Sequence, residues 1–166
     1  MTPSGLRYDG QAVTYPQPSE IAPPFEMRAD DGSVVTSEGL AGRRYVLFFY
    51  PKDDTTGCTA QACGLRDAWD AVADLDTEIF GVSPDSVASH VKFRDKYGLR
   101  HRLLSDDGHK VAEAYGTWVE KSYLGRTYFG TERTTFVIGP DGRIEHVFPR
   151  VKPGEHVSML VEVLAA

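Results

Sequence analysis

Both cysteines of this 166-residue chain lie close together, at Cys58 and Cys63, in the stretch YPKDDTTGCTAQACG (residues 50–64). Apolar residues recur every three or four positions after them, which predicts a helix that begins near Cys58. A thiol in the first turn of a helix lies near unpaired backbone N–H groups and the positive end of the helix dipole, and both favour the thiolate. In a reducing compartment, two such cysteines indicate redox or metal chemistry rather than a structural disulfide.

A reactive thiolate needs a donor beyond the helix itself. Lowering the pKa of a cysteine by about three units takes roughly 4 kcal/mol. A favourable helix terminus supplies up to about 2 kcal/mol, and a charge-assisted hydrogen bond supplies about 1.5–3 kcal/mol. We therefore expect an arginine beside the sulfur. Thr55 lies three residues earlier, so its hydroxyl can face the sulfur across a tight turn, and Pro51 constrains the exit of the chain from the preceding strand.

The net charge of −6 disfavours nucleic acid and anionic membranes as partners, because both bind positively charged surfaces. The chain contains no run of about 18 apolar residues, so we predict no membrane span. Residues 1–20 have neither the basic nor the apolar region of a signal peptide. We therefore expect a cytoplasmic protein with reduced thiols.

Neither a metal nor a cofactor is expected. A C-x-x-x-x-C pair without other convergent ligands is a poor zinc signal. The acidic pair Asp53 and Asp54 is interpreted as a solvated loop. The histidines show no metal-ligand spacing, and they stand at His90, His101, His109, His146 and His156.

The chain divides into an extended or disordered arm over residues 1–18, which is rich in proline, and one domain over residues 19–166. In the domain, an Asp-Gly turn in FEMRADDGSVVTS predicts a hairpin. RYVLFFY (residues 44–50) is typical of a strand buried on both faces. A helix after the cysteines should bury one apolar stripe, which consists of Ala62, Leu65, Trp69, Val72 and Leu75.

The rest of the chain continues the alternation of strand and helix. TEIFGVS predicts a strand, and Ser83 with Pro84 predicts the start of a helix that turns Val87, Val91 and Tyr97 inward. RHRLLS predicts a short strand and HKVAEAYG a short helix. GPDG joins TTFVI to RIEHVF as a hairpin, and GEHVSMLVEVL is a final helix. This order predicts an α/β protein with a central mixed β-sheet flanked by helices, and a thioredoxin-like fold satisfies it.

Three aromatic residues fall in sequence that has the character of a loop. They are Trp118, Tyr128 and Phe129. They could wall a substrate pocket or contact a partner.

The segment PKDDTTGC (residues 51–58) fits the P-x-x-x-T-x-x-C active-site motif of the peroxiredoxins. FYPKDDTTGCTAQACGLRD resembles the bacterioferritin comigratory protein subfamily, also called the Q-type peroxiredoxins. A second stretch, EKSYLGRTYFGTERTTFVIGPDGRI, resembles the same subfamily and carries Arg133 just before a predicted strand. The resemblance covers about residues 20–166.

This resemblance implies a thiol-dependent peroxidase that reduces hydrogen peroxide and organic hydroperoxides. Cys58 would be the peroxidatic cysteine and Cys63 the resolving cysteine, and the two would form an intramolecular disulfide. Thr55 and Arg133 would orient and polarise the peroxide, and Pro51 would shield the pocket. The resemblance also implies thioredoxin or a similar dithiol as reductant, and a monomer rather than a dimer.

Three of these residues also have a structural interpretation. Cys63 could belong to the core beside Leu65, Thr55 could only cap a turn, and Arg133 could be a surface charge paired with Glu132. A disulfide oxidoreductase of thioredoxin type is disfavoured, because C-x-x-C is absent. A role as a redox sensor that uses the same cysteines stays open, in addition to peroxidase activity or in place of it, and a protein that is only a sensor would turn over once.

Overall fold

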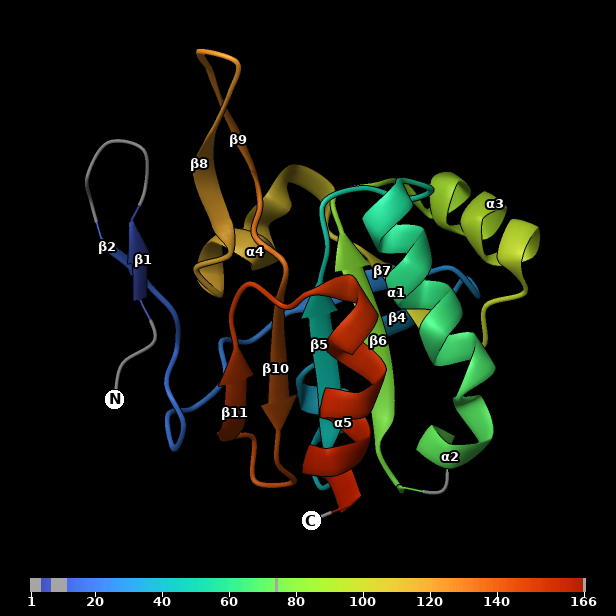
Figure 1. Ribbon diagram of the computed structural model, residues 1–166. Coiled ribbons are helices and arrows are strands. Elements are labelled where there is room, and N and C mark those ends of the chain that lie inside the picture. The colour runs from blue at the N-terminus through green and yellow to red at the C-terminus, as the bar shows by residue number, and fades with distance from the viewer. Residues whose placement is uncertain (1–3, 7–11, 74, 166) are drawn as a thin grey trace.

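The computed structural model describes residues 4–6, 12–73 and 75–165 (Figure 1). Its centre is a seven-stranded mixed sheet, in which β5 pairs with β6 and β6 with β7 in parallel, and the other pairs are antiparallel. In spatial order the strands are β11 (Ile144–Phe148), β10 (Thr134–Ile138), β5 (Tyr45–Phe49), β6 (Glu78–Ser83), β7 (Arg102–Ser105), β3 (Glu26–Ala29) and β4 (Val34–Thr36). The predicted mixed sheet and both predicted hairpins are confirmed.

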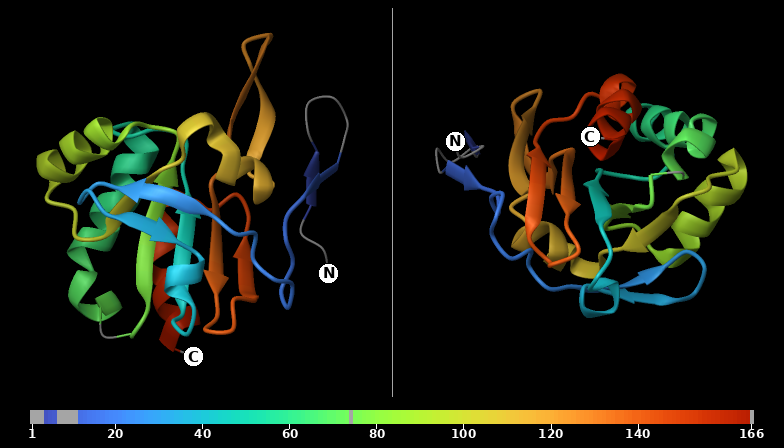
Figure 2. Two further views of the ribbon diagram at one scale, coloured as in Figure 1. Left: turned by 180° about the vertical axis from the view of Figure 1, so that it is seen from behind. Right: turned by 90° about the horizontal axis from the view of Figure 1, so that it is seen from below.

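Helices cover both faces of the sheet (Figure 2). The α-helices are α1 (Thr56–Asp67), α2 (Trp69–Ala73), α3 (Val87–Tyr97), α4 (Lys110–Ala114) and α5 (His156–Ala165). Short 3-10 helices are η1 (Glu38–Leu40), η2 (Asp107–His109) and η3 (Pro153–Glu155). One buried cluster joins α1, α2, α3 and α5 to the sheet, and a second joins α4 and η1 to the opposite face.

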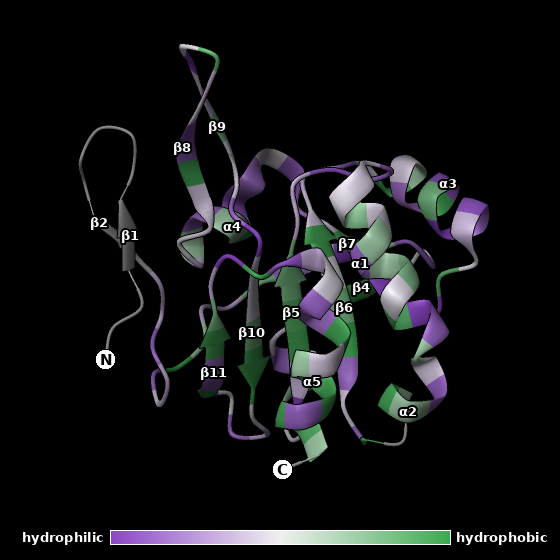
Figure 3. Cartoon of the chain, in the orientation of Figure 1, coloured by the Kyte–Doolittle hydropathy of each residue, from purple (hydrophilic) through white to green (hydrophobic). Residues whose placement is uncertain are grey.

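The central strand β5 explains why two cores form. All five of its residues are buried, as the apolar run predicts. Side chains alternate between the faces of a strand, so Val46 and Phe48 enter the core under α1 and α5, whereas Leu47 and Phe49 enter the core under α4. Figure 3 shows the same concentration of hydrophobic residues along β5 and β10.

The start of α3 differs from the prediction. Ser86, not Ser83, is the N-cap, and its hydroxyl accepts the backbone N–H of Ser89 at 3.1 Å. Of the three residues predicted to turn inward, Tyr97 packs against the core, but Val87 and Val91 are only partly buried. The fully buried residues of α3 are His90 and Phe93. A buried histidine is invisible to a pattern built from apolar residues.

The segment with loop-like sequence forms a two-stranded hairpin of β8 (Trp118–Tyr123) and β9 (Arg126–Thr131). It projects beyond the sheet at the end where β5 leads into α1 (Figures 1 and 2). Trp118 stacks on His109 with ring centroids 3.9 Å apart. Tyr128 and Phe129 are about half exposed, at 50% and 52%.

The N-terminal segment contains two short paired strands, β1 (Ser4–Leu6) and β2 (Ala12–Thr14). The next residue, Tyr15, is buried, and its hydroxyl donates to Glu132 at 2.8 Å. The chain is therefore attached to the domain from Tyr15 onward. The boundary at residue 18 between arm and domain stays a prediction.

Two neutral histidines lie inside the core beside Phe48, whose ring centroid is 5.3 Å from that of His101 and 5.0 Å from that of His156. Neither ring nitrogen of His101 meets a hydrogen-bond partner in the part of the chain that the structure describes. Burial lowers the pKa of His101 from 6.5 to about 4, and that of His156 from 6.5 to about 3. Both rings are therefore uncharged in the folded protein at neutral pH.

Acid is expected to destabilise the fold from pH 6.5 down to about 4. In this range the unfolded chain binds protons at both histidines and the native chain does not. The free energy of unfolding should therefore decrease as the pH decreases, by up to about 1.4 kcal/mol per pH unit for each histidine. Replacing His101 by phenylalanine removes one of the two sites. Urea unfolding across this pH range should then give a shallower dependence, and identical slopes for the two proteins would contradict the assignment.

Candidate active site

The turn over residues 51–55 leads from β5 into α1, and it places Cys58 in the first turn of the helix, as predicted. The side chain of Cys58 is buried, at 2% exposure. No acidic residue stands in the first turn of α1, so no negative side chain there offsets the positive end of the helix dipole. The surroundings of the sulfur on this side therefore favour negative charge.

Arg133 supplies the expected cation beside the sulfur. It lies between β9 and β10, and its Nη2 donates to Cys58 Sγ at 3.3 Å while Nη1 donates to Gln61 Oε1 at 2.6 Å. The alternative pairing with Glu132 is not what the structure contains, because Glu132 accepts from Arg150 at 2.7 Å and from Tyr15. Arg133 is therefore directed into the cysteine site.

Gly57 has no side chain, and this lets the guanidinium of Arg133 approach the helix closely. A β-carbon at this position would lie 3.1 Å from Arg133 Nη2 and 3.4 Å from Pro153 Cγ. Any side chain here would push against the arginine. The glycine of the TTGC segment thus makes room for the donor that Cys58 needs.

Gln61 is a site residue that the sequence analysis missed. It follows Cys58 by three positions on α1, so both side chains lie on one helix face. Gln61 is 1% exposed, and its Nε2 has no partner among the described residues. Gln61 Oε1 accepts a hydrogen bond from Nη1 of Arg133, while Nη2 of the same arginine bonds the sulfur of Cys58. The i, i+3 spacing from Cys58 was the available signal.

Lys121 of β8 is a second residue near the site that was not predicted from the sequence. Its Nζ donates to the carbonyl of Thr131 at 2.5 Å, two residues before Arg133. Burial lowers the pKa of Lys121 from its ordinary value, and the charge of Arg133 lowers it further. Both effects disfavour the charged form of Lys121, and the nearby carboxylate of Glu132 opposes them.

Thr55 occupies the N-cap position of α1, with an extended backbone. Its hydroxyl donates to the carbonyl of Lys52 at 2.9 Å, instead of pairing with Cys58. The lone pairs of the hydroxyl stay available to a ligand. Pro51 lies half-buried at the start of the same turn.

Cys63 lies in the same helix as Cys58, and both are free thiols. Cys63 is partly exposed, whereas Leu65 is fully buried. Cys63 therefore does not share the place of Leu65 in the core.

Asp53 corrects the interpretation of the acidic pair as a solvated loop. Asp54 is exposed, but Asp53 is buried, with 7% exposure. Its contacts hold the turn that precedes α1.

The AhpC/TSA family matches residues 18–147, so the chain belongs to this family. Within the family it is similar to the Bcp and Q-type peroxiredoxins. It is 44% identical over 140 residues to the putative peroxiredoxin bcp of Coxiella burnetii, covering 84% of this chain and 93% of the relative. It is 44% identical over 143 residues to the peroxiredoxin Bcp of Bacillus subtilis, covering 86% and 91%.

Solved structures agree with the sequence relatives. A cysteine-to-serine mutant of PrxQ from Xylella fastidiosa superposes with a TM-score of 0.85 at 26% identity, covering 92% of this chain and 97% of that one. Peroxiredoxin Q of Xanthomonas campestris gives a TM-score of 0.80 at 31% identity, covering 85% and 89%. The thioredoxin-like fold is thereby confirmed, and the chain is a thiol-dependent peroxidase.

Within the described ranges, no helix has both the length and the apolar character needed to cross a membrane.

Proposed function

We propose that Cys58 is the peroxidatic cysteine and that Arg133, Thr55 and Pro51 form its peroxide site. The observation that carries this proposal is the fork of Arg133, which bonds Cys58 Sγ at 3.3 Å and Gln61 at 2.6 Å. A guanidinium held by two partners keeps a defined direction. It can therefore stabilise charge at the sulfur and at an oxygen beside it.

In the proposed reaction, the thiolate of Cys58 attacks one oxygen of the hydroperoxide and the O–O bond breaks. The sulfur is oxidised to a sulfenic acid, and the other oxygen leaves as hydroxide or alkoxide, which takes up the proton that the thiol lost on ionising. An ordinary thiol is already a few per cent ionised at neutral pH, so complete ionisation gains only about thirtyfold. Further acceleration must come from donors directed at the developing negative oxygen.

Three groups are suited to act on the peroxide. Arg133 and the backbone N–H of Cys58 can donate to the oxygen that gains charge. The hydroxyl of Thr55 donates to Lys52, so its lone pairs can accept the O–H of the substrate. Pro51 has no backbone N–H, so it lines the turn without adding a competing donor.

We further infer that Cys63 resolves the sulfenic acid. Its thiol would condense with the Cys58 sulfenic acid, forming the disulfide and releasing water. A thioredoxin-like dithiol would then return both cysteines to thiols. We propose that the protein acts on hydrogen peroxide and organic hydroperoxides, as a monomer in the cytoplasm.

Mass spectrometry of the intact protein tests the assignment of Cys63. After one equivalent of hydrogen peroxide, the protein should lose the mass of two hydrogen atoms, because an internal disulfide forms. The Cys63→Ser variant should instead gain one oxygen at Cys58, and excess peroxide should oxidise it further. If turnover with a dithiol reductant is unchanged in this variant and the disulfide never forms in the native protein, Cys63 has only a structural role.

Formation of this disulfide is expected to unwind part of α1. Five residues of α-helix separate two Cα atoms by roughly 8.7 Å, from about 7.5 Å of rise and 140° of rotation. A disulfide requires Cα atoms within about 7 Å. Since α1 is continuous through Cys58 and Cys63, the reduced helix cannot hold the bond.

Amide hydrogen exchange measures this unwinding. Residues 58–65 should exchange faster in the disulfide form than in the dithiol form. Gly64 lies within the segment and weakens a helix by up to about 1 kcal/mol relative to alanine. The strands β5 and β6 serve as the internal control, since their exchange should not change. Equal protection of residues 58–65 in both forms would show that no unwinding occurs.

A further inference from the structure

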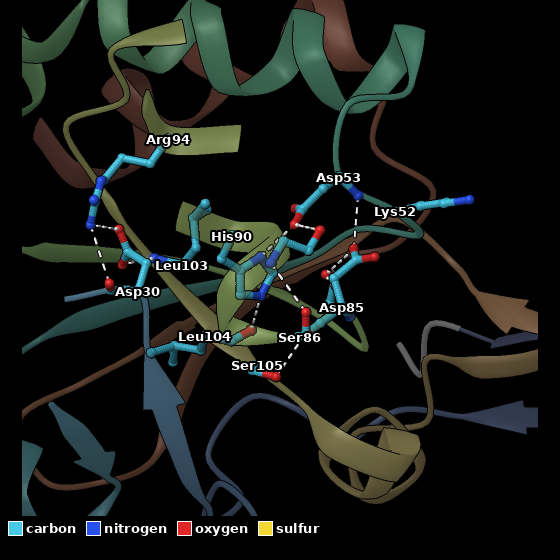
Figure 4. Close-up of polar contacts among 12 residues, drawn as sticks. Asp30, Lys52, Asp53, Asp85, Ser86, His90, Arg94, Leu103, Leu104 and Ser105 are labelled. Atoms are coloured by element: carbon cyan, nitrogen blue, oxygen red, sulfur yellow. Dashed lines mark hydrogen bonds and ion pairs between the residues drawn. The ribbon is translucent and has the colours of Figure 1, made fainter. Parts of the chain in front are cut away.

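The turn before α1 is held by a buried carboxylate, that of Asp53 (Figure 4). One oxygen, Oδ1, accepts the hydroxyl of Tyr50 at 2.6 Å. The other, Oδ2, accepts the hydroxyl of Ser89 at 2.8 Å and lies 2.7 Å from Nδ1 of His90. The carboxylate thus joins the end of β5 to two residues of α3.

His90 is fully buried, and both of its ring nitrogens face oxygen atoms. Nε2 lies 3.0 Å from the carbonyl oxygen of Leu104, which can only accept, so Nε2 carries a proton. The bond between Nδ1 and Asp53 Oδ2 then needs one further proton, carried by either atom. In both arrangements the pair has no net charge and keeps its hydrogen bond. This explains how the two groups are buried at 0% and 4% side-chain exposure.

The backbone on either side of Asp53 leads directly to the proposed peroxide site. The carbonyl of Lys52 accepts the hydroxyl of Thr55 at 2.9 Å. The carbonyl of Thr55 accepts the N–H of Thr59 at 2.8 Å, one of the first hydrogen bonds of α1. Displacing Asp53 would therefore move Thr55 and the first turn of the helix, where Cys58 lies.

The same turn makes two further contacts. The N–H of Asp53 donates to Oδ2 of Asp85 at 2.8 Å. Asp54 has a left-handed backbone, with φ of 57°, and its exposed carboxylate bonds Lys96 at 2.7 Å and Tyr97 at 2.6 Å. The buried contact with His90 and this exposed contact are both made by α3.

A metal ion is not needed to explain the cluster. Ligand atoms of Asp53, Asp85 and His90 lie within 4.8 Å of one another. However, Nδ1 of His90 already bonds Asp53, and Oδ2 of Asp85 accepts both Ser83 Oγ at 2.6 Å and the N–H of Asp53. Hydrogen bonds satisfy these atoms.

We propose that His90 is a positioning residue for Cys58 and Thr55, which it holds in reactive geometry by anchoring Asp53 to α3. This inference rests on the proposed function, in which Cys58 attacks the peroxide. A small displacement of reacting groups is enough to lower a rate strongly, by on the order of a hundredfold for about 1 Å. The contact is therefore expected to matter more for reaction with peroxide than for simple reactivity of the thiolate.

Two rates measured on each variant separate these effects. Stopped-flow measurement gives the second-order rate of reduced Cys58 with hydrogen peroxide, which needs the oriented site. Alkylation of Cys58 by iodoacetamide needs the thiolate but not the peroxide geometry. His90→Ala and Asp53→Ala should each lower the peroxide rate by about 30- to 100-fold, and the alkylation rate by no more than about threefold.

Asp53→Asn is the conservative rescue. Its Nδ2–H can donate to Nδ1 of a neutral His90, while its Oδ1 still accepts Tyr50. It should therefore keep the peroxide rate within about threefold of that of the unmodified protein. The matched control is Lys96→Met, which removes the exposed ion pair of α3 with the same turn and should change the rate by less than about twofold.

Three results would overturn the proposal. They are an unchanged peroxide rate in His90→Ala, an equal fall of both rates, and an Asp53→Asn variant as slow as Asp53→Ala. If His90→Ala does not fold, Tyr50→Phe removes one bond to Asp53 and should still lower the peroxide rate by about three- to tenfold, so an unchanged rate would be equally decisive. Turnover that survives Cys58→Ser would overturn the proposed function instead.

Discussion

Cys58→Ser is expected to abolish peroxide turnover and leave the fold intact. The serine hydroxyl stays protonated at neutral pH, and neither the helix dipole nor Arg133 can ionise it, so no nucleophile remains. Serine is close to cysteine in size, and Cys58 contributes only one small side chain to the core under α1. Turnover should therefore fall to the background rate, while circular dichroism and the thermal unfolding midpoint change little.

The assay for this variant couples peroxide consumption to a recycling dithiol reductant. Cys63→Ser is its matched control, because it removes the other thiol and should still consume one equivalent of peroxide. Substantial turnover by Cys58→Ser would show that the nucleophile has been assigned to the wrong residue.

Arg133→Lys is expected to slow the reaction with peroxide by about 10²- to 10³-fold, the usual cost of losing one donor to a developing oxyanion. Lysine keeps the charge but loses the planar fork. A single ammonium cannot reproduce the two directed bonds at 3.3 Å to Cys58 and 2.6 Å to Gln61. The thiolate itself should be affected much less, since positive charge is retained beside it.

The same pair of rates tests this prediction. Alkylation by iodoacetamide reports the thiolate that remains, and stopped-flow oxidation reports the reaction with peroxide. A peroxide rate that fell only in proportion to the alkylation rate would mean that Arg133 acts on the sulfur alone and does not polarise the substrate.

The sequence predicted those elements whose burial is carried by apolar side chains. β5 was recognisable because both of its faces enter a core, and α5 because its apolar stripe covers the sheet. The β8–β9 hairpin was missed because it stands away from the sheet, so most of β9 is exposed and no alternation of apolar and polar residues is required. The start of α3 was misplaced because Ser83 and Ser86 are both good caps, and only tertiary contacts choose between them.

The residues of the candidate site fall into the same two groups, those that were predicted from the sequence and those that were missed. Cys58, Thr55 and Arg133 were predicted from their place in a motif, and the structure brings Cys58 and Arg133 into contact. Gln61 and Asp53 were missed because a buried polar residue depends on a partner distant in sequence. Gln61 needs Arg133, and Asp53 needs His90. Such pairs leave no periodic pattern in the chain.

The division between α1 and α2 at Ala68 limits how far the proposed unwinding of α1 can extend in each catalytic cycle. A helix of 12 residues is marginal without tertiary contacts, and α1 is bounded on one side by an anchored turn and on the other by this break. Unwinding between the two cysteines can therefore stay local, and the strands beneath need not open. A protein built in this way can pass through many catalytic cycles, because the proposed unwinding opens only the part of α1 between the two cysteines and leaves the pairing of the sheet strands in place.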